Sequence, residues 1–238
     1  MVFPNATLPH QAMCSRYTLT SPPEAVRVIF GYGNEADFPP RYNIAPSQPV
    51  AIVRHGLRGQ RELALVRWGL IPPWVKDPMS FAMLINARAE TADVKPSFRG
   101  ALRHRRCLVP ADGFYEWTGR AGAKQPHLIK PKDGGSIALA GLWEHWLGAD
   151  GSELETMAIL TTTANAEMAA IHDRMPVILT PDQFDEWLDC RSGRSQEAKR
   201  LLKPLPDGSL EITPVSKELN NPRNDFPEVQ HNVPGTLL

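Results

Sequence analysis

Proline restricts the fold of this chain more than any other residue: it accounts for 23 of the 238 residues, almost twice the usual share. Because proline fixes φ and lacks an amide hydrogen, it interrupts helices but is tolerated at turns and sheet edges. The composition therefore favours many short extended segments over a helical bundle. The length suits one large domain or two small ones, and no change in composition marks a linker. We predict a single α+β domain in which strands dominate.

Alternating apolar and polar residues predict most of the strands, and capping residues predict a few short helices. Residues 39–46 are expected to form an extended loop, residues 176–179 to be extended, and residues 85–91 to open a short helix. A tight turn is expected at Ala111 and Asp112. The expected strands are 14–20, 49–54, 62–68, 106–110, 113–117, 126–130, 136–141, 156–162 and 211–216, and the expected helices are 23–30, 164–171, 181–188 and 196–202.

The charge and cysteine content argue against several classes of protein. The net charge is zero, so the chain lacks the basic excess of a general nucleic-acid binder, although a local basic patch stays open. Three widely spaced cysteines give neither a disulfide framework nor a paired-cysteine zinc spacing. A reducing compartment is the simplest interpretation.

The ends of the chain are expected to lie outside the folded domain. The first twelve residues lack the basic stretch and apolar run of a secretory signal, and no segment approaches the roughly 18 apolar residues that span a bilayer. Because Met13 is itself a candidate translation start, we expect residues 1–12 to be a leader that is disordered, not translated, or removed. The domain is then expected over residues 13–230, with a short tail over 231–238.

Cys14 directly follows Met13, so it can become the first residue of the mature protein. It would then carry an α-amine and a thiol on adjacent carbons. An α-amine titrates near ~7.7–8.0, which leaves a sizeable fraction neutral at physiological pH. Such an amine condenses with an aldehyde to a Schiff base, and the neighbouring thiol can close a thiazolidine ring on the same carbon. The alternative is an ordinary small buried cysteine.

Three more polar residues stand in apolar or aromatic surroundings: Asn86, Glu116 and His172. Burial between Tyr115 and Trp117 would raise the pKa of Glu116 and suit it to proton transfer near neutral pH. The alternatives are that Glu116 faces solvent, that His172 has its hydrogen bonds satisfied at a helix end, and that Asn86 is a turn or capping residue.

Basic and aromatic residues outline a candidate surface for single-stranded nucleic acid. The segment from Arg99 to Arg106 holds four arginines, and Trp74 and Trp117 are suited to stacking on bases. The alternatives are a solvated face for the arginines and core positions for the tryptophans. The sequence holds no G-x-S-x-G nucleophile elbow, phosphate loop or G-x-G-x-x-G, and its histidines show no metal spacing.

Taken together, an ordered set of short segments resembles the SOS-response-associated peptidase family, the SRAP-domain or abasic-site processing proteins. Each segment is weakly specific alone, whereas the ordered set is highly specific and extends from Met13 to about Val229. Ser15 and Tyr17 replace the glycine and phenylalanine common at the start of the family. The matching segments are 13–17, 41–46, 68–72, 85–91, 105–110, 113–117, 125–126, 140–143 and 171–176.

The resemblance implies a compact α+β domain with a strongly bent, barrel-like mixed sheet. It further implies binding of single-stranded DNA at abasic sites, and a covalent thiazolidine crosslink through N-terminal Cys14. AP-lyase activity and autoproteolytic exposure of the cysteine are also expected. Neither metal nor cofactor is implied, and we expect a cytoplasmic monomer without membrane contact, associated with the nucleoid when DNA is damaged. The implied catalytic residues are Cys14, Asn86, Glu116 and His172, and the implied DNA-binding residues are Arg16, Asn43, Trp74, Arg88, Trp117 and Arg174.

In this interpretation Glu116 relays protons, His172 protonates the departing sugar oxygen, and Asn86 holds the N-terminal residue. Two other functions stay open. One is a cysteine peptidase or amidase, with a Cys14 thiolate, His172 as base and Asn86 as its orienting partner. The other is a non-covalent binder of single-stranded DNA.

Overall fold

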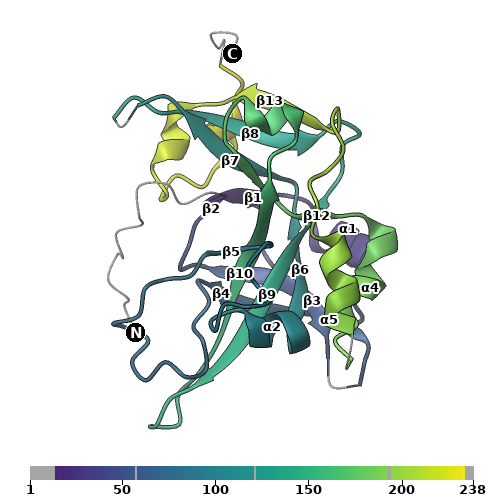
Figure 1. Ribbon diagram of the computed structural model, residues 1–238. Coiled ribbons are helices and arrows are strands. Elements are labelled where there is room, and N and C mark those ends of the chain that lie inside the picture. The colour runs from purple at the N-terminus through teal and green to yellow at the C-terminus, as the bar shows by residue number, and fades with distance from the viewer. Residues whose placement is uncertain (1–13, 57, 121, 192–193, 234–238) are drawn as a thin grey trace.

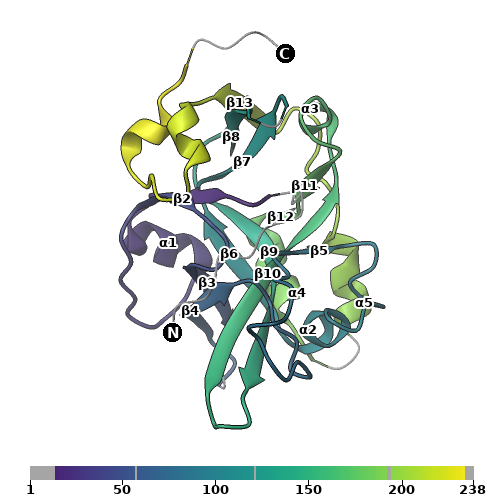
Figure 2. The same cartoon turned by 90° about the vertical axis from the view of Figure 1, so that its left-hand side faces the viewer.

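The computed structural model describes residues 14–56, 58–120, 122–191 and 194–233. The predicted leader and the last five residues of the predicted tail lie outside the described residues. The described strands form two sheets (Figures 1 and 2). In spatial order, the smaller sheet holds β13 (Leu210–Pro214), β8 (Gln125–Pro131), β7 (Gly113–Thr118), β1 (Tyr17–Leu19) and β2 (Arg41–Ile44). The larger holds β11 (Arg174–Pro176), β10 (Glu153–Thr163), β4 (Arg61–Trp68), β3 (Pro49–His55), β6 (Arg106–Ala111), β9 (Ile137–Leu147) and β12 (Ile178–Leu179), with β5 (Asn86–Arg88) paired to β10.

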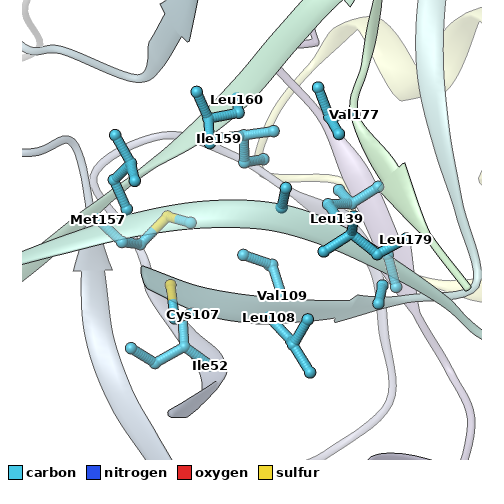
Figure 3. Close-up of a cluster of buried hydrophobic side chains, with 14 of the residues drawn as sticks. Ile52, Cys107, Leu108, Val109, Leu139, Met157, Ile159, Leu160, Val177 and Leu179 are labelled. Carbon is cyan, nitrogen blue, oxygen red and sulfur yellow. The ribbon is translucent and has the colours of Figure 1, made fainter. Parts of the chain in front are cut away.

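The larger sheet closes on itself, because β9 pairs with β10 as well as with β6. β10 runs parallel to β4, and β3 and β6 complete the ring through antiparallel pairs. Apolar side chains from these strands pack together as a core (Figure 3), in which each buried side chain contributes roughly 1.5–3 kcal/mol. Fully buried side chains of this core include Ile52, Leu108, Leu139, Met157 and Ile159. The predicted α+β class and strongly bent, barrel-like sheet are confirmed.

The helices are short and lie outside the ring. α1 (Pro23–Phe30) has the predicted bounds, because a proline begins it and Gly31, at φ +67°, ends it by donating its N–H to Arg27 O. The predicted helix over 164–171 is a single turn, α3 (Ala166–Ala169). The other helices are α2 (Arg99–His104), α4 (Phe184–Leu188) and α5 (Arg194–Ala198), with 3₁₀ turns at Pro181–Gln183, Lys199–Leu201, Lys217–Asn220 and Pro227–Gln230. In the described part of the chain, no helix is both long and apolar enough to cross a membrane.

Two predicted segments are wrong in type. Residues 86–88 form β5 instead of opening a helix, because they pair in parallel with β10 at Ile159 to Thr161. Residues 41–44 form β2 instead of a loop, because they pair with β1. In both cases the partner strand is distant in the sequence, so tertiary pairing overrides the local preference.

The expected turn after β6 carries the chain from the larger sheet into the smaller one. Asp112 fixes this transition, since its carboxylate accepts hydrogen bonds from the backbone N–H groups of Thr20 (2.6 Å) and Ser21 (2.7 Å). It also accepts from the hydroxyl of Ser136 at 2.7 Å. The two strands on either side of Asp112 therefore belong to different sheets, and β7 is directed toward β1.

Candidate active site

The start of β1 places Cys14 against the side chain of Glu116 on β7. Antiparallel pairing sets Tyr17 opposite Phe114, and the backbone nitrogen of Cys14 donates to Oε1 of Glu116 at 2.6 Å. Cys14 has no exposed surface and Glu116 is 5% exposed. The alternative of a solvent-facing Glu116 is therefore wrong. Two residues that are 102 positions apart in the sequence share one buried hydrogen bond.

Burial sets the protonation of both groups. It raises the pKa of Glu116 to about 7, against the lowering effects of the Cys14 and Trp117 backbone N–H groups and the Lys124 charge. Near neutral pH this carboxyl can therefore accept or donate a proton. Burial, with the nearby Glu116 carboxylate, raises the pKa of the Cys14 thiol well above its usual range. A thiolate nucleophile needs a lowered pKa, so this environment argues against a thiolate peptidase.

His172 follows α3 and is half-buried, with its side chain 24% exposed. Its Nδ1 lies 2.9 Å from Oδ1 of Asp173 and 3.1 Å from the backbone nitrogen of Arg174, so either neighbour can pair with this ring nitrogen. Burial lowers the pKa of His172, Asp173 opposes this shift, and the positive charges of Arg174 and Lys124 add to it. The lowered pKa favours the neutral ring near pH 7, whose N–H can donate a hydrogen bond.

Asn86 and Arg174 lie on strands that pair with the same part of β10. In β5, Asn86 pairs with Ile159, and in β11, Arg174 pairs with Thr163. Asn86 is partly buried. The sequence-predicted residues therefore come from segments that are far apart in the sequence. Cys14 and Glu116 lie beside β1, and Asn86 and Arg174 lie on strands that pair with β10.

Lys124 connects the two halves of the candidate site and was missed from the sequence. This exposed lysine lies in the turn between β7 and β8, and its charge lowers the pKa of both Glu116 and His172. Both groups are therefore within the electrostatic influence of Lys124. The segment 119–124 has the composition of an ordinary hairpin connection, and only the position of Lys124 beside Gln125 and Pro126 could have indicated it.

Arg16, two residues after Cys14, is a partly buried cation with neutral partners. Its guanidinium donates to Oδ1 of Asn43 at 2.9 Å and to the carbonyl of Leu219 at 3.1 Å, and lies 5.8 Å from the ring centre of Trp117. Burial lowers the pKa of Arg16 to about 10, so it stays charged at neutral pH. Among the described residues, no carboxylate forms an ion pair with it. Its charge is available to an anion.

Asn43 has no exposed surface and is not available to DNA in this structure. Its Nδ2 donates to the carbonyls of Leu219, Asn221 and Asn224 at 3.2, 3.1 and 2.8 Å, while its Oδ1 accepts from Arg16. Asn43 instead joins Arg16 to the C-terminal segment. A buried role of this kind has no local sequence signal.

The remaining predicted DNA-binding residues differ in their availability. Arg88 is exposed on β5, whereas Arg174 already forms a two-fold hydrogen-bonded ion pair with Glu90 at 3.0 and 2.8 Å. Trp117 is half-buried and donates its Nε1–H to Oδ1 of Asn220 at 2.7 Å. Trp74 is 57% exposed, so a core position for it is wrong.

The arginine segment from Arg99 to Arg106 is not one solvated or DNA-facing surface. Arg106 is 1% exposed and donates to the carbonyls of Leu102, Trp187 and Asp189 at 2.7, 2.5 and 2.5 Å. It therefore holds α2 and the end of α4 onto β6. In the described residues no three His, Cys, Asp or Glu side chains gather to hold a metal ion.

Comparisons with known proteins agree with this geometry. The family model of the SOS response associated peptidase (SRAP) matches residues 13–222. The chain is 42% identical over 222 residues to the abasic site processing protein YoqW of Bacillus subtilis, covering 91% of this chain and 98% of that protein. It is 35% identical over 225 residues to the abasic site processing protein HMCES of Gallus gallus, covering 82% of this chain and 66% of that protein.

Solved structures show the same fold. A protein from Bacteroides thetaiotaomicron superposes with a TM-score of 0.79 at 28% identity, over 92% of this chain and all of that chain. A protein from Bordetella bronchiseptica superposes with a TM-score of 0.74 at 30% identity, over 85% of this chain and all of that chain. The chain belongs to the SOS response associated peptidase (SRAP) family.

Proposed function

We propose that this chain binds abasic sites in single-stranded DNA covalently, through the α-amine and thiol of Cys14 once that residue is the first of the chain. The 2.6 Å hydrogen bond between the Cys14 nitrogen and Glu116 Oε1 carries the proposal, because it joins the reacting nitrogen to a proton-transfer group. Relatives named as abasic site processing proteins supply the substrate class.

The first step joins nitrogen to carbon. An abasic deoxyribose in its open form carries an aldehyde at C1′, and the neutral amine of Cys14 adds to this carbon. Glu116 takes the proton that the nitrogen loses and returns a proton to the hydroxyl that leaves as water, which gives the Schiff base. A pKa of about 7 suits Glu116 to both transfers.

The second step closes the ring. The Cys14 sulfur adds to the Schiff-base carbon, and the thiol proton reaches the nitrogen through Glu116, so that no further atom is lost. Since burial keeps this thiol protonated, the amine reacts first. His172 donates a hydrogen bond to the ring oxygen of the closed sugar and promotes opening to the aldehyde. Asn86 holds the N-terminal residue in place.

Exposure of the amine requires hydrolysis of the Met13–Cys14 peptide bond, and the same contact suits this step. Protonated Glu116 lies within hydrogen-bonding distance of the nitrogen that leaves and can deliver its proton. Cys14 also has φ +44°, a conformation that costs a residue other than glycine roughly 1–2 kcal/mol, and cleavage removes this restriction. As a base at C2′ of the Schiff base, Glu116 could further eliminate the 3′ phosphate, which is the expected lyase activity.

DNA is expected to bind through phosphates and unpaired bases. Arg16 has a charge without an acidic partner among the described residues, and Arg88 is exposed. Arg174 would exchange Glu90 for a phosphate, and Trp74 offers an exposed ring for stacking. Because phosphates supply much of the attraction, binding should weaken with salt. A DNA substrate implies action in the cytoplasm at the nucleoid.

The test is a crosslinking assay with a single-stranded oligonucleotide that holds one abasic site. Protein beginning at Cys14 should give a product that survives boiling in detergent. Cys14→Ser keeps the amine but lacks the thiol, so its adduct should need borohydride to survive. A wild-type protein that never stays attached after denaturation would refute the proposal, and peptide hydrolysis without crosslinking would favour the peptidase.

A further inference from the structure

Trp74 lies on a segment whose two ends are tied together. The N–H of Leu70 donates to the carbonyl of Leu84 at 2.9 Å, which closes residues 71–84 into a loop directly before Asn86. The exposed ring of Trp74 lies edge-to-face against Phe81, with ring centres 5.7 Å apart. Loops of this length whose ends lie close together depend on side-chain packing to support one shape.

The hairpin of β9 and β10 supplies that support. Its tip projects beyond the rest of the larger sheet (Figures 1 and 2), and both strands are 11 residues long. Nε1 of Trp146 donates to the carbonyl of Val75 at 2.6 Å, and the hydroxyl of Thr156 accepts the N–H of Ile71 at 3.0 Å.

These contacts bury a small cluster that is separate from the main core. Ile71, Val75 and Trp146 are at most 8% exposed, and Phe81 and Leu154 pack against them. Trp146 therefore hydrogen-bonds to Val75, the residue after Trp74. It also belongs to the same apolar cluster as Phe81, whose ring packs against Trp74. Because the cluster is separate from the ring core, weakening it should disturb the loop more than the global fold.

We propose that Trp146 is a positioning residue for DNA binding, which holds the loop 71–84 on the β9–β10 hairpin so that Trp74 is presented to an unpaired base beside the abasic site. The inference rests on the proposed function, since it assigns the ligand of Trp74. It adds a buried residue that is outside the set expected to contact DNA.

The experiment compares four variants of the protein that begins at Cys14: Trp146→Phe, Trp74→Ala, their double variant, and Trp143→Phe as control. Phenylalanine keeps the aromatic packing but removes the N–H. Trp143 lies three residues away on β9, and its side chain packs with Arg54 instead of the cluster. Each protein is tested for affinity and crosslinking rate with the abasic oligonucleotide. Each is also tested for its reaction with 2-deoxyribose 5-phosphate, which has the aldehyde but no neighbouring base on which Trp74 could stack.

Trp146→Phe should weaken affinity and slow crosslinking of the oligonucleotide by about two- to tenfold, the effect of one lost hydrogen bond. Its rate with the small aldehyde should match wild type. Trp74→Ala should weaken the oligonucleotide reaction by about tenfold, and the double variant should be no worse than Trp74→Ala alone, because the two act as a unit. Trp143→Phe should match wild type throughout.

Three results would overturn the inference. The first is a double variant whose loss of affinity is the product of the two single losses, and the second is an unchanged oligonucleotide affinity in Trp146→Phe. The third is a Trp146→Phe reaction that is slowed as much with the small aldehyde as with the oligonucleotide. The non-covalent affinity reports on positioning even where no crosslink forms. Failure of wild type to crosslink would therefore refute the proposed function, whereas the affinity of Trp146→Phe would still decide the role of Trp146.

Discussion

Replacing Glu116 by glutamine should change the pH dependence of stability as well as the reaction. The folded chain holds this carboxyl at a pKa of about 7, against an ordinary value of 4.5, and desolvation by burial is the main cause. The folded state therefore binds a proton that the unfolded state releases between these pH values. At about 1.4 kcal/mol per pH unit, wild type should lose roughly 3 kcal/mol of unfolding free energy as pH rises through this window.

Glutamine resembles the protonated acid, and its carbonyl oxygen can still accept the N–H of Cys14. The two proteins should therefore have similar stability near pH 4, and Glu116→Gln should be more stable by up to roughly 3 kcal/mol above pH 7. The same variant cannot transfer a proton, so crosslinking should slow by about 10²- to 10⁴-fold.

The assay is urea unfolding of both proteins between pH 4 and 8, with residues before Cys14 retained in each, as verified by intact mass. Other titrating groups cancel in the difference between the two unfolding free energies. A difference that stays constant across this range would refute the assignment of a raised pKa to Glu116. Stabilisation of this variant at high pH, together with full crosslinking activity when the same substitution is made in protein that begins at Cys14, would refute its role in proton transfer.

Three further variants test separate parts of the site. Lys124→Gln should shift the pH dependence of crosslinking upward, because the lysine charge lowers the pKa of Glu116, while Lys132→Gln leaves the profile unchanged. Arg16→Gln should weaken oligonucleotide binding by about tenfold and reduce the slope of log K against log salt by about 0.7; an unchanged slope would exclude a phosphate contact. Arg106→Met should destabilise the fold by ~3 kcal/mol or more in urea unfolding, because three buried carbonyls lose their donor, and wild-type stability would contradict this packing role.

The fold could be predicted from the sequence where the signal is local. Proline at the start of α1 and Gly31 at its end define that helix, and the strands predicted over 49–54 and 62–68 lie within β3 and β4. β5 shows the limit, since Asn86 to Arg88 gain their strand conformation only from β10, more than 70 positions away. The closure of the ring likewise depends on pairs of distant strands, β10 with β4 and β6 with β9, that no local pattern encodes.

The site could be predicted in its chemistry but not in its supports. Cys14 and Glu116 were indicated by residue type and setting, and the structure adds their contact. Asn43 illustrates the opposite case: a polar residue that matches a binding motif is fully buried and serves Arg16. Asn220 was given no role from the sequence, yet its side chain accepts from Trp117 and donates to the carbonyl of Lys124 at 3.3 Å.

The mass of the product formed with an abasic oligonucleotide tests the central claim most directly. A thiazolidine on processed protein should weigh the sum of protein and DNA less one water, place the linkage on Cys14 as the first residue, and gain no mass with borohydride. A linkage mapped to a lysine, or a crosslink formed by a chain that still carries Met13, would contradict the account.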